Sequence, residues 1–294
     1  MKKLCYLLCL MALPCLLAAQ QTVPQKENHL WGIVTIDSLQ HAPYDAWFKK
    51  NYADYKPTPS VIEQLKALKI NDFRIKIFFG TWCGDTKREM PRLLKVLDEM
   101  RFPKEKITFI ALSTEDSIRK QSKNREERGY NIFRVGCYVF EKNGIEVNRI
   151  NEFPALSMER DVLAIFSNQN YTPQYPVHAT VAQWLKDGTL LDDNISPQSL
   201  AIQVRNKVGS ISDLNTCGYV LMADKKIKEA VKLFRINATL FNDNSNAWHS
   251  LAEGWFKLGE KEKALLALEN GLNLNKDPSF SKAFLTLQKE ILAK

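Results

Sequence analysis

The chain has 294 residues, of which 45% are hydrophobic and 25% are charged, and this composition argues against a disordered, collagen-like or multi-span membrane protein. The formal net charge is +8, but the basic residues are spread along the chain and interleaved with acidic ones. The densest basic stretch, Arg119 to Arg128, also holds acidic residues, so we interpret it as a solvated helix or loop face rather than a phosphate-binding patch. We therefore expect no nucleic-acid partner.

Residues 1–19 have the order of a secretory signal peptide. Two lysines precede an apolar run that ends in small residues, so we expect cleavage near Ala19 and a secreted, periplasmic protein. The run is too short for a transmembrane helix and no later stretch is a candidate, which predicts no integral membrane span. Pro14 stands where a lipobox needs a small residue, and this disfavours a lipid anchor at Cys15.

Removal of the signal peptide leaves three cysteines, Cys83, Cys137 and Cys217. In an oxidising compartment an odd number allows at most one internal disulfide and leaves one thiol that is buried, reactive or paired with another chain. The length of the remaining chain predicts about two domains.

Residues 20–57 are an N-terminal extension without clear periodicity, apart from a possible strand at Gly32 to Ile36. After it, the spacing of apolar residues and the turn signals predict alternating helices and strands. These are a helix opened by Thr58-Pro59, a strand Phe73 to Phe79, a helix Cys83 to Met100, a strand Ile107 to Leu112, a hairpin of Tyr138 to Phe140 with Ile145 to Ile150, and a helix started by Pro154.

Residues 82–91 read WCGDTKREMP and come directly after the first buried strand and its turn. This segment resembles the W-C-x-x-C-x-x-E-x-P pattern of secreted, TlpA-like thioredoxins, and the order of the predicted elements agrees with that family. The resemblance implies an α/β thioredoxin-like domain over residues 58–168, with a mixed central sheet flanked by helices. It also implies thiol–disulfide chemistry at Cys83, with Trp82, Gly84 and Asp85 as its neighbours.

Two departures from the family pattern limit that chemistry. Thr86 stands where the family has a second cysteine, which resolves the mixed disulfide formed by the first. Gly136 takes the place of the cis-proline that faces the active cysteine. We therefore do not expect a dithiol reductase cycle within this one motif.

Cys83 lies at the expected N-terminal end of a helix, where free N–H groups favour a thiolate, and the Thr86 hydroxyl is expected to donate a hydrogen bond to it. The carboxylate of Asp85 acts in the opposite direction, so Cys83 is either reactive or an inert remnant of a decayed site. The family pattern places Glu89 near the active site, where it is either a proton relay or a solvated helix acid.

Cys137 comes after the loop that lies against the active cysteine in the thioredoxin fold. It either pairs with Cys83, as a resolving thiol or in a stable bridge, or it is a buried strand cysteine that behaves as a small hydrophobic residue.

Residues 211–294 contain a repeat, and residues 169–210 are a linker with helices at Val177 to Leu185 and Pro197 to Val208. Two stretches of this region resemble the tetratricopeptide pattern and follow its period of about 34 residues. The first comprises Leu214, Cys217, Gly218, Leu221, Ala230 and Phe234, and the second comprises Trp248, Leu251, Ala252, Trp255, Ala264 and Leu268. The small residues let paired helices approach, and Gly259 supplies a turn. A last helix with Phe284, Leu287 and Ile291 resembles a capping helix, and Cys217 falls on a core position.

The sequence thus predicts an α/β thioredoxin-like domain followed by an all-α repeat domain. We expect thiol–disulfide exchange through Cys83, with a protein partner or disulfide substrate held by the repeats; the alternative is an inactive thioredoxin-fold scaffold. The histidines lack metal-ligand spacing and there is no phosphate loop, so no cofactor or metal is expected. The oligomeric state and the identity of the partner stay open.

Overall fold

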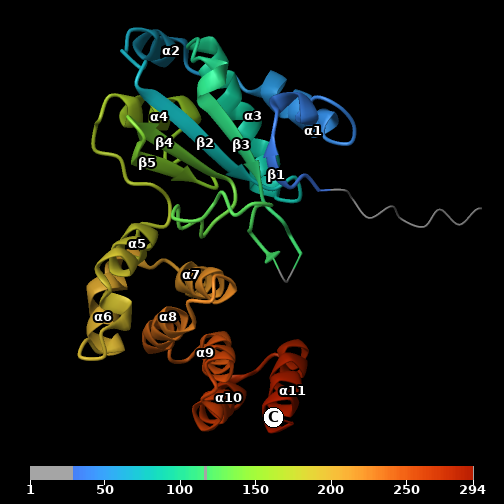
Figure 1. The fold of residues 1–294 in the computed structure, drawn as a ribbon, viewed down its shortest axis with the longest axis vertical. Helices are drawn as coiled ribbons and strands as arrows, with labels where there is room; N and C mark the ends of the chain where they lie inside the picture. The colour runs from blue at the N-terminus through green and yellow to red at the C-terminus, as the bar shows by residue number, and fades with distance from the viewer. Residues whose placement is uncertain (1–28, 116–117, 294) are drawn as a thin grey trace, which may run out of the picture.

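The computed structural model describes residues 29–115 and 118–293 and has an α/β part followed by an all-helical part (Figure 1). The signal peptide predicted for residues 1–19 lies outside the described residues. Among the helices of the described residues, none is both long enough and apolar enough to cross a membrane.

The α/β part is built on a mixed five-stranded sheet with the order β1-β3-β2-β4-β5. Its elements are β1 (Gly32–Val34), α1 (Asp45–Asp54), α2 (Pro59–Lys66), β2 (Phe73–Phe79), α3 (Gly84–Glu99), β3 (Ile107–Ala111), β4 (Cys137–Lys142), β5 (Ile145–Asn151) and α4 (Met158–Phe166). Strand β2 runs parallel to β3 and antiparallel to β4, while β1 is antiparallel to β3. The predicted hairpin is confirmed: β4 and β5 pair antiparallel, and Asn143 and Gly144 turn the chain with φ values of 53° and 78°.

Alternation along the strands divides the core between the two faces of the sheet. On one face, Ile77, Tyr138 and Phe140 pack with apolar residues of α3 and α4. On the other face, Phe78 and Cys137 pack with residues of the segment that joins β3 to β4. The sheet therefore has helices on one side and the long β3–β4 connection on the other.

The sequence did not predict α1. Of its ten residues only Phe48 is buried, so the segment shows no repeat of buried apolar residues at helical spacing. The prediction that Pro154 starts a helix was wrong by a few residues, because α4 begins at Met158. The carboxylate of Asp161 accepts hydrogen bonds from the backbone N–H groups of Ala155 and Leu156 and holds them ahead of the helix.

The helical part contains α5 (Val177–Asp187), α6 (Pro197–Val204), α7 (Ile211–Ala223), α8 (Ile227–Leu240), α9 (Ser245–Leu258), α10 (Lys261–Leu274) and α11 (Pro278–Leu292). Close approach of α7 and α8 requires Gly218, because a Cβ atom there would lie 2.3 Å from a ring carbon of Phe234. Gly259 ends α9 in the left-handed region with φ of 88°, as the predicted turn requires.

The two parts are joined through the β3–β4 connection. Arg134 donates to the Ser212 hydroxyl over 2.9 Å and lies 3.6 Å from the carboxylate of Asp213, both at the start of α7. At the other end of α7, Arg125 forms an ion pair with Asp224. The expectation that residues 119–128 form a solvated face was therefore wrong in part, because Arg125 of this stretch pairs with Asp224 of the helical part.

Candidate functional site

Cys83 lies where β2 turns into α3, as the N-cap residue of the helix. Its backbone N–H donates to the Gly80 carbonyl over 2.9 Å, and its own carbonyl accepts the first helical hydrogen bond from Lys87 over 3.0 Å. The side chain is half-buried. This position keeps the sulfur at the end of a helix where several backbone N–H groups lack a helical partner.

Trp82 closes the turn before Cys83. Its indole N–H donates to the Leu112 carbonyl over 2.9 Å, and its ring covers Gly80, where a Cβ atom would lie 2.5 Å from a ring carbon. Only glycine fits at position 80 for that reason. The turn is thereby fixed to the end of β3.

The N-terminal segment supports the same turn through Thr81, a residue that the sequence analysis did not select. Its hydroxyl accepts from the Leu30 N–H over 3.3 Å and lies 3.2 Å from Nδ1 of His29. Thr81 is 2% exposed. A buried threonine has no signal in sequence spacing, because its partners lie about fifty residues away in the chain.

The β3–β4 connection faces Cys83, as the resemblance implied. The Cys83 thiol donates to the Val135 carbonyl over 3.1 Å. At the next residue, Gly136, a Cβ atom would lie 2.7 Å from the Tyr138 hydroxyl oxygen and 3.3 Å from Oγ1 of Thr86. The structure thus brings Cys83, Thr86 and Gly136 together, and it adds Tyr138, which the sequence analysis did not select.

Thr86 does not make the hydrogen bond expected of it. The side chain is fully buried, and its hydroxyl accepts from the Gly80 N–H over 3.4 Å. The first turn of α3 directs this side chain toward Gly80 and Gly136, while the Cys83 thiol turns to Val135. The expectation that Thr86 donates to Cys83 is therefore corrected by the hydrogen bonds of both side chains.

Asp85 and Glu89 are both paired with arginine. Asp85 accepts from Arg88 over 2.8 Å, and one oxygen of Glu89 accepts from Arg88 and Arg92 over 2.5 and 3.2 Å. Glu89 is 2% exposed, so it is not the solvated helix acid that one sequence interpretation allowed. Gly84 begins α3 and has open space where a side chain would be.

Two buried polar atoms near this site lack a hydrogen-bond partner among the described residues, the second oxygen of Glu89 and the hydroxyl of Tyr138. Burial, followed by the negative charge of Glu89, raises the pKa of Tyr138 well above its usual value. The phenol therefore stays protonated and keeps a hydrogen-bond donor in the wall of the site.

Cys137 is free and buried in the apolar cluster on the face of the sheet away from α3. Its sulfur lies 3.8 Å from a guanidinium nitrogen of Arg149, and burial raises the pKa of its thiol to about 11. Cys83 packs at the edge of the same cluster and is also free, so the two are not bridged here. Pairing between them stays a prediction.

Cys217 is fully buried in the helical part and donates to the Asp213 carbonyl over 3.2 Å. Burial raises the pKa of its thiol above the usual value. Cys83 is thus the most accessible of the three cysteines that the structure describes.

Comparison with known proteins adds no family to this description: no family model matches the chain, and no curated protein matches it. The functional interpretation therefore depends on the residues around Cys83.

Proposed function

We propose that this chain is a thioredoxin-like protein that carries out thiol–disulfide exchange through Cys83 and binds a protein partner on its helical part. The observation that carries the proposal is the position of Cys83. A half-buried thiol at the N-cap of α3 donates to the Val135 carbonyl of the facing β3–β4 connection over 3.1 Å. Both the helix end and the facing loop suit a cysteine that exchanges with a disulfide.

The order of helices and strands along the chain supports the proposed fold. The order α2, β2, α3, β3, then the β4–β5 hairpin and α4, agrees with the thioredoxin-like domain expected over residues 58–168. The paired helices α7 with α8 and α9 with α10, followed by α11, support two tetratricopeptide repeats and a cap over residues 211–294. In this proposal, residues 20–57 are the N-terminal extension of the thioredoxin-like domain and residues 169–210 link that domain to the repeats. The proposed location of the protein is the periplasm.

The exchange needs no cofactor. The Cys83 thiol loses its proton to solvent, and the thiolate attacks one sulfur of a partner disulfide. A new sulfur–sulfur bond forms to Cys83, the partner's own bond breaks, and its second sulfur leaves as a thiolate that takes up a proton. No net oxidation occurs, because one disulfide replaces another.

Release of the partner requires a thiol from outside the motif. Thr86 has no sulfur, and the Cys137 thiol is protonated at neutral pH because burial raises its pKa to about 11. A low-molecular-weight thiol or a second thiol of the partner then attacks the mixed disulfide and restores Cys83. We therefore infer a monothiol cycle.

A binding protein without catalysis is the second candidate. It is favoured by the buried Thr86 side chain, which with its hydrogen bond to Gly80 fills the place of a resolving cysteine. In this alternative the helical part alone would carry the function. The two candidates differ in whether Cys83 forms mixed disulfides.

The test is incubation of the reduced protein with oxidised glutathione, followed by peptide mass spectrometry without reduction. We expect one glutathione adduct, located on Cys83 and removed by added reduced glutathione. Cys83→Ser is expected to abolish the adduct, and Cys137→Ser, the matched control, is expected to retain it. Absence of an adduct on folded wild-type protein would contradict the exchange proposal and leave the binding function.

A further inference from the structure

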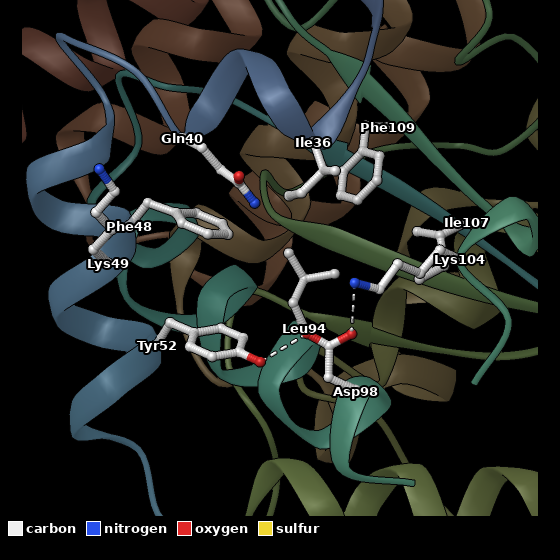
Figure 2. A pocket seen from close by; sticks show the side chains of 10 residues that line it. All are labelled: Ile36, Gln40, Phe48, Lys49, Tyr52, Leu94, Asp98, Lys104, Ile107 and Phe109. Carbon is white, nitrogen blue, oxygen red and sulfur yellow. Dashed lines mark hydrogen bonds and ion pairs between the residues drawn. The ribbon is translucent and has the colours of Figure 1, made fainter. Parts of the chain in front are cut away.

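A cavity lies between α1, α3 and β3, away from Cys83. It has a volume of about 440 Å³, within the range of small-molecule sites (Figure 2). Leu94, in its wall, lies eleven positions after Cys83 in the sequence, which corresponds to about 16 Å along α3 at 1.5 Å per residue. The cavity is therefore separate from the thiol site, and a ligand bound in it would not depend on the function proposed for Cys83.

Half of the ten residues that line the cavity are apolar. Phe48 of α1 and Phe109 of β3 stand on opposite sides, and Leu94 of α3 lies between them (Figure 2). Ile36, from the short helical turn η1 (Ile36–Leu39), and Ile107 complete the apolar lining. Four separate elements thus shape one hydrophobic space.

The charged groups at the opening are already paired. The ammonium of Lys104 lies 3.5 Å from the carboxylate of Asp98, which also accepts from the Tyr52 hydroxyl over 2.7 Å. Lys49 pairs with Asp45 over 3.0 Å. An ionic ligand would have to compete with these pairs or enter the apolar space without a counter-charge, and both are unfavourable.

One polar side chain at the cavity, that of Gln40, is available to hydrogen-bond a ligand. The side chain of Gln40 is exposed, its amide has no hydrogen-bond partner among the described residues, and it points toward the space between Phe48 and Ile36 (Figure 2). An amide offers both a donor and an acceptor. It supplies one directional contact beside the apolar side chains of Phe48 and Ile36.

We propose that this cavity binds an uncharged, mainly apolar small molecule of the two- or three-ring aromatic class that carries one hydrogen-bonding group. The apolar body lies between Phe48 and Phe109, and its polar group meets the amide of Gln40. The volume and the apolar side chains favour an apolar ligand of this size, the paired charges disfavour an ionic one, and the amide of Gln40 favours one hydrogen-bonding group.

Two fluorescent probes with the same ring system test the assignment. N-phenylnaphthylamine is uncharged and has a single N–H group, whereas anilinonaphthalene sulfonate carries an added negative charge. We expect saturable, one-to-one binding of the neutral probe to the purified chain, with the anionic probe weaker by about tenfold or more. Equal affinity of the two probes, or no saturable binding of the neutral one, would overturn the proposal.

Location is tested with a matched pair of tryptophan substitutions. Ile36→Trp fills the cavity and is expected to weaken neutral-probe binding by about tenfold or more, whereas Ile33→Trp, at a position 62% exposed on β1 and outside the cavity, is expected to leave it unchanged. Gln40→Leu changes only an exposed side chain and should weaken the same probe about threefold or more. Unchanged binding in the folded Gln40→Leu protein, or in folded Ile36→Trp, would contradict the site.

Discussion

Two positions, one in each part of the molecule, require glycine because a neighbouring side chain lies too close for a Cβ atom. The neighbour is an apolar ring in one case and a pair of hydroxyl groups in the other. A Cβ atom on Gly218 would lie within 2.3 to 2.9 Å of three carbons of the Phe234 ring. A Cβ atom on Gly136 would instead lie nearest to the phenol of Tyr138 and next to the Thr86 hydroxyl. The first glycine serves helix packing, and the second preserves a polar arrangement beside a thiol.

The two glycines also differ in how the side chains beside them are packed. The Phe234 ring also fills the space left by Gly254 on α9, so α7, α8 and α9 meet around one buried side chain. Around Gly136, by contrast, the Tyr138 hydroxyl is buried without a partner among the described residues. An unpartnered buried hydroxyl costs stability, so packing alone does not explain the Tyr138 side chain.

Gly218→Ala should produce the largest loss of stability. Alanine alone would favour the helix by roughly 0.5 to 1 kcal/mol, but its Cβ atom would overlap the fully buried Phe234 ring. We expect a net loss of about 2 kcal/mol in the free energy of unfolding, measured with urea. Gly84→Ala is the control, because nothing lies within 4 Å of its Cβ position. Equal effects of the two substitutions would contradict the packing argument.

His178 of α5, whose ring contacts Phe133 of the β3–β4 connection, should make the protein acid-sensitive. Burial, with the positive charge of Arg134, lowers the pKa of His178 to about 3, from 6.5 in the unfolded chain. The unfolded chain binds this proton first, so stability is complete above about pH 6.5 and falls as the pH drops toward 3. At pH 5 the loss is up to about 2 kcal/mol.

The check is urea unfolding of wild-type protein and His178→Gln at pH 7 and pH 5. The variant cannot titrate at this position, so the wild type should lose more stability between the two values than the variant does. A pH dependence shared equally by both proteins would assign the acid sensitivity to other groups.

Gly136→Ala should affect the thiol site more than the fold. The added Cβ atom displaces the Tyr138 hydroxyl and approaches Thr86, and we expect about 1 kcal/mol of lost stability. Because Val135 receives the Cys83 thiol and precedes Gly136, the alkylation rate of Cys83 should also change, by about threefold or more. Gly218→Ala, compared under conditions where it is folded, should leave that rate unchanged.

Tyr138→Phe should have the smallest effect on stability. Removal of an unpartnered buried hydroxyl is expected to leave the free energy of unfolding unchanged or to raise it by up to about 1 kcal/mol. If the phenol serves exchange, the rate of adduct formation with oxidised glutathione falls in the same variant. A stability loss of more than about 1 kcal/mol would mean that the hydroxyl has a partner after all.

Local signals in the sequence predicted much of the secondary structure. The predicted strand Phe73–Phe79, which alternates at first and then runs apolar, is β2, and Asn143 and Gly144 turn the hairpin because both adopt positive φ. Helix α1 was missed because Phe48 is its single buried residue. Signals of this kind work where burial is periodic along one element.

The candidate site was predicted only where a motif named its residues. Cys83 and Thr86 of the motif come together with Gly136, as the family resemblance implied. Thr81 and Tyr138 were missed because their contacts arise from packing between distant segments. The loop of residues 119–128 was misjudged for the same reason. Arg125 forms an ion pair with Asp224, about a hundred positions later in the chain, and the local charge pattern does not predict this pairing.

The most direct test of the account is the alkylation rate of each cysteine in folded, reduced protein, followed by mass spectrometry across a pH series. The thiolate is the reacting species, and Cys137 and Cys217 are 1% and 0% exposed with raised pKa values. We predict that Cys83 reacts faster than either by about a hundredfold or more at pH 8. Comparable rates at the three positions, or an unreactive Cys83, would contradict the claim that Cys83 is the chemical centre of this protein.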